Sequence, residues 1–257
     1  MISMNILAIG NSFSQDATRY LHAVMLSGGV AGRVVNLYIG GCSLEQHWRN
    51  AQTDSAGYLY ELNGESTGRY VSIAQALAEG GWDVITLQQA SHDSGLERTY
   101  FPYLEELLAY VRRAAPKARV LLHETWAYER DSTHPQFPRY HCDQAEMYAS
   151  LRGAYAAAAQ RCGLDMLPCG DVVQAVRGRA PFVYEAGGMS LGRDGFHMSL
   201  TYGRYLLAAV WYETLTGRSI YSSSYAPCAP LAPEGESVDG AALDVIRAAV
   251  HERCGGI

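Results

Sequence analysis

The chain has 257 residues, of which 48% are hydrophobic and 18% are charged, so it can bury a sizeable core and is not globally disordered. This length fits one large α/β domain or two small ones. The net charge is −6 and no basic block is present, which argues against a nucleic-acid-binding protein.

Short apolar runs alternate with longer amphipathic segments, which predicts strands alternating with helices. The expected strands are residues 5–9, 34–39, 84–87, 120–123 and 165–167. The expected helices are residues 15–26, 44–51, 73–79, 103–114, 144–161, 172–177, 201–216 and 240–253. This alternation is typical of an α/β fold in which a parallel sheet carries helices on both faces.

Two segments depart from the alternation. Residues 57–71 place tyrosines around Asn63-Gly64, which predicts a β-hairpin inserted after the second strand–helix unit. Residues 221–237 are rich in proline and lack periodicity, which indicates an irregular surface segment. We find no clear domain boundary, and we expect residues 1–257 to form a single domain.

Glycine and polar residues follow four of the predicted strands. Ligands bind beyond the carboxyl ends of parallel strands, so these residues should gather at one edge of the sheet. They are Gly10-Asn11-Ser12, Gly40-Gly41-Cys42, Gln88-Gln89-Ala90-Ser91 and Glu124-Thr125-Trp126.

Ser12 is the candidate nucleophile. It precedes a predicted helix, so its N–H would lie at a helix N-terminus, where the partial positive charge favours an anion. Taken alone, the pattern is better explained by Ser12 or Ser14 capping the helix. A nucleophilic serine also needs a base, an orienting acid and donors for the oxyanion.

Asp194 and His197 are the candidate acid and base. They lie three residues apart, so that one turn places both on the same face. A lone pair of this kind is more often a turn aspartate and a surface histidine. Asp16 is a competing acid, but it falls in the first turn of the predicted helix, where the helix dipole explains a carboxylate.

Gly41 and the glutamine pair are the candidate oxyanion donors. Gly41 offers a backbone N–H that no Cβ obstructs, and Gln88 or Gln89 offers a side-chain amide. A tight turn and surface polarity would also explain these residues. Two consecutive glutamines at the end of a buried strand are harder to dismiss, because burying them unpaired is costly.

Four blocks in this order resemble the SGNH hydrolases, also called GDSL-type esterases and lipases. The blocks are IGNSFS (9–14), NLYIGGCS (36–43), DVITLQQASHDSG (83–95) and DGFHMS (194–199). The resemblance spans roughly residues 5 to 216, and WDVITLQQASHDSG and ETWAY resemble an uncharacterised branch of that superfamily. It implies a flavodoxin-like three-layer α/β/α sandwich with a five-stranded parallel sheet in the order 2-1-3-4-5.

The same resemblance implies a Ser12–His197–Asp194 triad, with the Ser12 and Gly41 N–H groups as oxyanion donors. Two positions depart from the family pattern. Asn11 stands where the family usually has aspartate, and the third block lacks the asparagine that donates to the oxyanion. The sialate and acetylxylan esterase branches have Gln-Gly-Glu there, so the resemblance favours Gln89 as the donor, with Gln88 as the alternative.

Further residues at the same edge are candidates for contact with substrate, although packing or solvation would also explain them. They are Asn11, His92, Glu124, Trp126 and Tyr128. A second group, His134, His141, Cys142 and Asp143, has a spacing that fits no metal motif, so we expect neither a metal nor any other cofactor.

The function expected from these residues is hydrolysis of an acyl ester, with an acetyl group on a carbohydrate as the first choice. That choice rests on the glutamines of the third block, the 18 tyrosines and the lack of a long apolar lid segment. The alternatives are a lipid or thioester acyl hydrolase, and a non-catalytic carbohydrate-binding protein on the same fold. Nucleotide binding is disfavoured because IGNSFSQDA lacks the residues of a phosphate loop.

The remaining expectations concern the environment of the protein. The six cysteines form no C-x-x-C pair, so we expect reduced thiols and no structural zinc. No signal-peptide pattern and no apolar run of bilayer length is present, so we expect a cytoplasmic location and no membrane partner. The expected partner is a small-molecule ester, and the sequence leaves the oligomeric state open.

Overall fold

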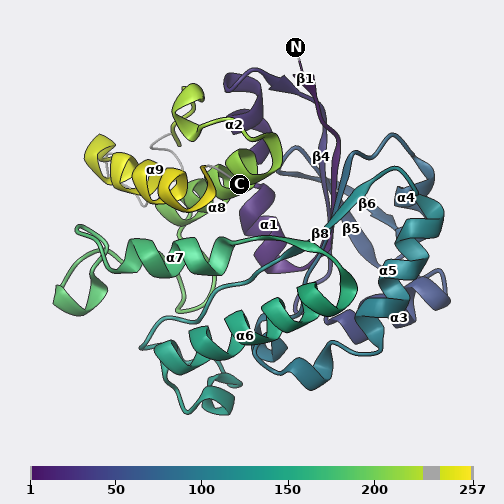
Figure 1. The fold of residues 1–257 in the computed structure, drawn as a ribbon, viewed down its shortest axis with the longest axis horizontal. Helices are drawn as coiled ribbons and strands as arrows, with labels where there is room; N and C mark the ends of the chain where they lie inside the picture. Colours follow the sequence, from purple (N-terminus) through teal and green to yellow (C-terminus); the bar gives the residue numbers. More distant parts are fainter. Residues whose placement is uncertain (1, 228–237, 256–257) are drawn as a thin grey trace.

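The computed structural model describes residues 2–227 and 238–255 (Figure 1). A seven-stranded sheet runs through the molecule in the order β6-β5-β4-β2-β7-β8-β9. Its strands are β2 (Ile6–Gly10), β4 (Val34–Tyr38), β5 (Tyr58–Leu62), β6 (Glu65–Val71), β7 (Val84–Leu87), β8 (Arg119–His123) and β9 (Asp165–Leu167). Two short strands, β1 (Ile2–Ser3) and β3 (Val30–Ala31), form a separate parallel pair.

The expected number of five strands was wrong, because the predicted hairpin joins the sheet. Strands β4, β2, β7, β8 and β9 are parallel and follow the expected order. Strand β5 then pairs antiparallel with β4, and β6 with β5. Asn63 and Gly64 both have positive φ angles, of 55° and 85°, as a tight Asn-Gly hairpin turn requires.

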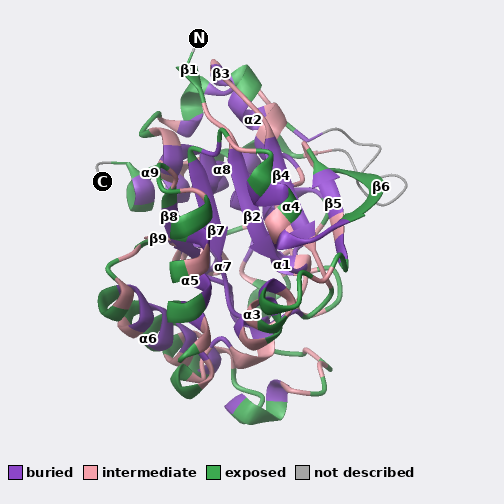
Figure 2. Ribbon diagram, turned by 90° about the vertical axis from the view of Figure 1, so that its right-hand side faces the viewer, coloured by how far each residue is buried: buried purple, intermediate pink, exposed green. Residues whose placement is uncertain are grey.

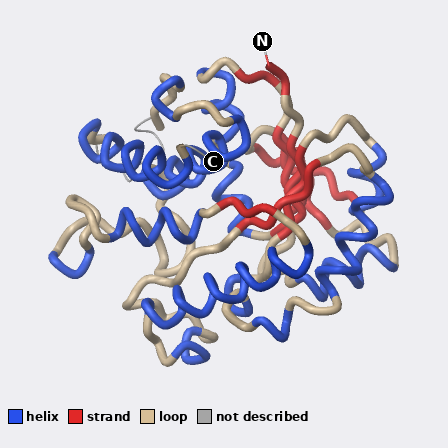
Figure 3. Tube along the Cα trace, in the orientation of Figure 1, coloured by secondary structure: helices blue, strands red, loops and turns tan. Residues whose placement is uncertain are grey.

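Helices cover both faces of the sheet (Figure 3). One layer holds α1 (Ser12–Thr18), α2 (Leu21–Ser27), α7 (Cys169–Arg177), α8 (Tyr202–Thr216) and α9 (Gly240–Cys254). The other holds α3 (Leu44–Gln52), α4 (Ile73–Ala78) and α5 (Tyr103–Ala114), while α6 (Gln144–Cys162) packs into both cores. Figure 2 shows the sheet buried between these layers, with β6 exposed at its edge.

The side chains of β2 show why the strand needs both layers. Ile6 and Ala8 point into the core beneath α1 and α8, whereas Leu7 and Ile9 point into the core beneath α3 and α5. Successive side chains of a strand face opposite sides, so a strand covered on both faces reads as one continuous apolar run.

Most predicted elements begin and end within three residues of the observed ones, but the predicted helix at 15–26 was wrong. The segment forms two helices, and the first begins at Ser12 because Asn11 caps it. The chain breaks at Arg19 and Tyr20 without a glycine or proline. Nearby, the Thr18 hydroxyl donates to the Ser14 carbonyl at 2.8 Å, a type of bond that often bends a helix. A threonine inside a helical pattern does not by itself predict where the helix ends.

The C-terminal irregular segment is described only in part. Residues Ile220–Ser222 form a short 3-10 turn, and residues 228–237 lie outside the described residues. The five cysteines of the described ranges are all unpaired. Over those same ranges, no helix is both long and apolar enough to cross a membrane.

Candidate active site

Ser12 is the first residue of α1, directly beyond the end of β2. Asn11 caps this helix, because its side-chain oxygen accepts the N–H of Phe13 at 3.0 Å. Ser14 accepts the N–H of Asn11 in return, at 3.1 Å, so the expectation that Ser12 or Ser14 is the cap was wrong: Asn11 is the cap, and Ser14 is its partner in the capping box. Ser12 itself is half-buried, and its hydroxyl and N–H bond to no other described residue.

Ser14, by contrast, belongs to a buried polar network. Its hydroxyl lies 2.6 Å from the Asn36 side-chain oxygen on β4. The Asn36 amide donates in turn to the carboxylate of Glu61 on β5 at 2.7 Å. Of the two serines, one therefore holds the helix in place and the other is available for chemistry.

Asp194 and His197 are joined as expected. The Asp194 carboxylate lies 2.7 Å from His197 Nδ1 and also accepts the N–H groups of His197 and Phe196, at 2.8 and 3.2 Å. Burial would raise the pKa of Asp194, but these hydrogen bonds outweigh it and lower the pKa. The carboxylate therefore favours the tautomer with the proton on Nδ1, and Nε2 bonds to no other described residue.

Several contacts hold the His197 loop against α1. The ring of Phe13, the neighbour of Ser12, lies 5.9 Å from the His197 ring and stacks on Trp126 at 4.1 Å. The Trp126 N–H donates to the Phe196 carbonyl at 2.8 Å. Trp126, expected as a substrate contact, is thus buried and connects helix α1 to the His197 loop.

Asp16 does not act as the orienting acid, since its bonds go elsewhere. The fully buried carboxylate accepts from Arg193 at 2.9 Å, from Arg204 at 2.8 Å and from the Met198 N–H at 2.9 Å. These bonds tie α1 to both ends of the His197 loop.

Gly41 lies in the exposed loop after β4 with a positive φ of 64°, and its N–H bonds to no other described residue. The next carbonyl, of Cys42, accepts the Asn11 side-chain N–H at 3.0 Å. The Asn11 side chain thus links the loop of Gly41 to the start of α1. At this edge of the sheet, two backbone donors, the N–H groups of Ser12 and Gly41, have no partner among the described residues.

The two glutamines are both buried, and the side-chain nitrogen of each already donates to another residue, so neither presents the free amide expected of an oxyanion donor. Gln89 directs its amide nitrogen to the carbonyl and hydroxyl of Thr99, both at 3.0 Å, and its oxygen accepts from Leu44 N–H. Gln88 donates to the Asn11 side-chain oxygen at 2.7 Å. It is therefore Gln88 that touches the residue next to Ser12.

The Asn11–Gln88 contact also fixes the tautomer of a buried histidine. The Asn11 oxygen accepts from Phe13 N–H, so the nitrogen of Gln88 must face it, and the oxygen of Gln88 faces His123 Nδ1 at 2.7 Å. His123 Nδ1 therefore carries the proton. Burial lowers the pKa of His123 to about 3, so this imidazole is neutral.

The expected substrate contacts His92 and Tyr128 lie close to each other beside the His197 loop. The ring of His134 lies 4.6 Å from Tyr128, 4.8 Å from Phe196 and 6.2 Å from His92. The Tyr128 hydroxyl is bonded to Ser91 at 2.9 Å. Sequence reasoning missed Phe196 and His134 as neighbours of the site, although Phe196 stands inside the DGFH block.

Glu124, also expected to contact substrate, is turned toward α7. Its carboxylate accepts the Asp171 N–H at 3.0 Å, and one of its oxygens is buried without a partner among the described residues. Burial and the nearby Asp171 carboxylate raise the pKa of Glu124 to about 8. Of the group His134, His141, Cys142 and Asp143, His141 lies 2.8 Å from the Glu146 carboxylate, and the described residues contain no cluster of side chains that could hold a metal ion.

Comparison with known proteins places this chain in a family. The family model described as "Domain of unknown function (DUF4886)" matches residues 5–252. The structure of a DUF4886 family protein from Bacteroides uniformis is 36% identical, with 97% of this chain and 94% of that chain covered and a TM-score of 0.86. Comparison with curated proteins gives no match.

More distant structures share the fold. A candidate SGNH hydrolase from Slackia heliotrinireducens is 22% identical, with 83% of this chain and 99% of that chain covered and a TM-score of 0.56. A variant of an acetyl-xylooligosaccharide esterase from Geobacillus is 13% identical, with 84% and 96% covered and a TM-score of 0.55. The chain therefore belongs to the DUF4886 family, and it has the fold of the SGNH hydrolases that its sequence resembles.

Proposed function

We propose that this protein is a serine esterase that hydrolyses a short acyl ester, first of all an acetyl ester on a carbohydrate. One observation carries the proposal: the Ser12 hydroxyl, which bonds to no other described residue, stands at a helix N-terminus, on the helix to which the loop of Asp194 and His197 is tied. A structural serine would be bonded as Ser14 is.

In the proposed reaction, His197 Nε2 takes the hydroxyl proton as Ser12 Oγ attacks the ester carbonyl carbon. The oxyanion accepts hydrogen bonds from the N–H groups of Ser12 and Gly41. Collapse of the tetrahedral intermediate breaks the bond to the alcohol, which leaves with the proton from His197. Water then repeats the sequence on the acyl-enzyme and releases the acid.

Gln88 is proposed as a positioning residue. Its bond to the Asn11 side chain holds the amide that links α1 to the Gly41 loop, and so sets the separation of the two backbone donors. Loss of one oxyanion donor lowers turnover by about 10²–10³ in serine hydrolases.

The carbohydrate preference rests on the polar wall formed by the partly exposed His92 and His134 beside the His197 loop, and on the similarity of fold to an acetyl-xylooligosaccharide esterase. Hydrolysis of acetyl and octanoyl nitrophenyl esters separates this proposal from a lipid or thioester acyl hydrolase. A strong preference for octanoyl would contradict the deacetylase proposal.

The decisive experiment is labelling with a fluorophosphonate probe, followed by peptide mass mapping. We expect one adduct, on Ser12, and none in the Ser12→Ala variant. An unfolded variant would also fail to react with the probe, so loss of labelling in Ser12→Ala needs a second control. The Asp194→Asn variant keeps Ser12 and should be labelled more slowly. Folded protein with no adduct on Ser12 would favour the non-catalytic carbohydrate-binding protein.

A further inference from the structure

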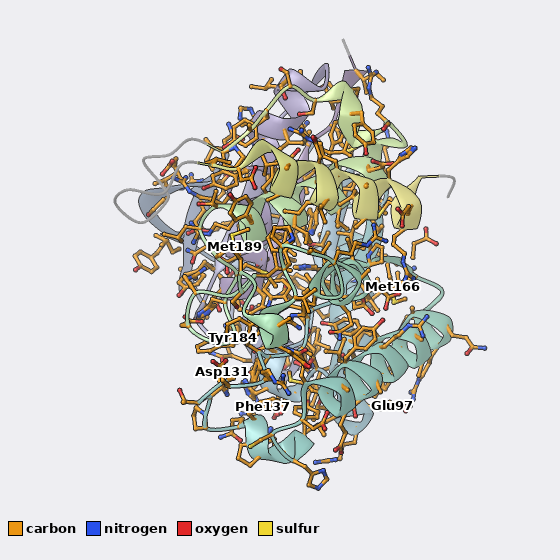
Figure 4. The ribbon with its side chains drawn as sticks, turned by 90° about the vertical axis from the view of Figure 1, so that its left-hand side faces the viewer. Glu97, Asp131, Phe137, Met166, Tyr184 and Met189 are labelled. Carbon is orange, nitrogen blue, oxygen red and sulfur yellow. The ribbon has the colours of Figure 1, made fainter. Side chains whose placement is uncertain are left out.

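A pocket of about 270 Å³ is lined in part by Glu129, which is bonded to the His197 loop through the Gly195 carbonyl. It lies among the segment after β8, helices α6 and α7 and the short turn Tyr184–Ala186. The residues that matter here are Glu129, Gln144, Gln174, Arg177, Phe182 and Tyr184. Figure 4 faces this side of the molecule, with Tyr184 beside Asp131, to which its hydroxyl donates at 2.7 Å.

Two of the residues that line this pocket each have a polar atom that is buried without a partner among the described residues. The two atoms are the Nε–H donor of Arg177 and the side-chain oxygen acceptor of Gln174. The Arg177 side chain is only 8% exposed, and its other nitrogens are occupied by the Ala127 carbonyl at 3.0 Å and by Glu129 at 3.7 Å. An unpaired buried group of this kind costs roughly 1–3 kcal/mol, so a bound molecule that satisfied both would gain affinity.

The charges of the pocket exclude ionic ligands. The Arg177 guanidinium faces the Glu129 carboxylate, which also accepts from Gln144 at 2.7 Å and from Ser190 at 3.0 Å. At the mouth, Arg130 pairs with Glu185 at 3.0 Å. Each fixed charge already has an opposite partner, so an anion or a cation would meet a repelling group as close as an attracting one.

A ligand that fits must offer an acceptor to Arg177, a donor to Gln174 and an apolar face to the exposed Tyr184 ring. We propose that this pocket binds one neutral sugar ring, whose hydroxyl groups donate and accept and whose C–H face packs on Tyr184. The volume is close to the lower end of the roughly 300–1,000 Å³ typical of small-molecule sites, which matches a single ring.

The pocket is coupled to the loop that carries Asp194 and His197. The Glu129 N–H donates to the Gly195 carbonyl at 2.7 Å, and the Ser190 hydroxyl reaches the Glu129 carboxylate from the start of the same loop. If the proposed esterase activity holds, this site receives a neighbouring unit of the same carbohydrate. Sugar binding itself does not depend on Ser12.

The test is calorimetric titration of the whole protein, in its wild-type and Ser12→Ala forms, with glucose, xylose, glucuronate and glucosamine. We expect saturable binding of a neutral sugar in both forms and no binding of the two charged sugars. Gln174→Leu, which removes the acceptor at similar volume, should weaken binding by about tenfold or more. Gln160→Leu makes the same change at an exposed position of α6 and should leave binding unaltered.

A second variant guards against misfolding of the first. Arg177→Lys keeps the charge but removes the Nε–H, and it should weaken binding as well, with circular dichroism confirming the fold of each variant. Absence of sugar binding, equal binding by Gln174→Leu, or equal binding of glucuronate would each overturn the proposal. Sugar binding without any fluorophosphonate adduct on Ser12 would retain this site and reject the esterase.

Discussion

The carboxylate of Asp16 accepts the backbone N–H of Met198 at 2.9 Å, although 182 positions separate the two residues. Asp16 lies one helical turn after Ser12, and Met198 directly follows His197. The same carboxylate holds Arg193 and Arg204 on either side of the loop. The helix of the serine and the loop of the histidine are therefore fixed to each other by one buried acid.

We predict that Asp16→Ala loses both stability and activity. Removing one partner of a buried ion pair costs about 3–5 kcal/mol, and partial exposure of the two arginines should reduce this to about 2–3 kcal/mol. Urea unfolding measures the free energy, and nitrophenyl acetate turnover measures the activity. Asp244→Ala, which breaks an exposed pair with Arg247, is the control and should cost at most about 0.5 kcal/mol. Equal losses in the two variants would contradict the role of Asp16.

The two serines of α1 should respond in opposite ways to replacement by alanine. Ser12→Ala should abolish turnover and leave the free energy of unfolding nearly unchanged, because its hydroxyl bonds to no other described residue. Ser14→Ala breaks the capping box and a buried bond to Asn36, and should cost about 1–3 kcal/mol. A Ser12→Ala enzyme that retained its turnover would rule out the proposed nucleophile.

The glutamines offer a similar comparison. Gln88→Leu removes the hydrogen bond that Gln88 donates to the Asn11 side-chain oxygen, next to Ser12. The two backbone donors should then lose their alignment, and kcat/KM should fall by about 10². Gln89→Leu breaks bonds to Thr99 and Leu44, away from Ser12, so it should mainly lower the urea midpoint. If Gln89→Leu showed the larger loss of kcat/KM at full stability, the donor favoured by the sequence would be the correct one.

Glu124 should make stability depend on pH. Its pKa is about 8 in the folded protein against 4.5 as the ordinary value, so the folded state binds the proton more tightly. Its contribution is fully present below pH 4.5 and is lost as the pH rises toward 8, with a slope of at most about 1.4 kcal/mol per pH unit. Glu124→Gln mimics the neutral acid, and its unfolding free energy should be flatter between these values. An unchanged slope would show that another group titrates.

The features that the sequence predicted well are those that depend on residues close together in the chain. The apolar runs of β7 and β9 set those strands, and Asn63-Gly64 sets the hairpin turn, because period and turn chemistry are local properties. The Asp194–His197 bond is also local, since three residues separate the partners. These parts of the fold and of the site could be predicted from the residues themselves.

The features that were missed depend on contacts between distant segments. Nothing near Asp16 indicates that its partners are Arg193 and Arg204, and a first-turn aspartate on a helix is fully explained by the dipole. The orientation of Gln89 depends on Thr99, which reaches it from a loop ten residues away. The pairing of the hairpin with β4 likewise follows from the open edge of the assembled sheet, and not from residues 57–71.

The hairpin has a consequence for how this protein can change in evolution. Glu61 on β5 accepts from Gln15 on α1 and from Asn36 on β4, and Asn36 holds Ser14. A shortened chain without β5 and β6 would leave both amides without their acceptor, next to the helix that carries the proposed nucleophile Ser12. We therefore expect homologues that lack the hairpin to carry different residues at positions 15 and 36, so that gain or loss of this element requires coordinated substitutions.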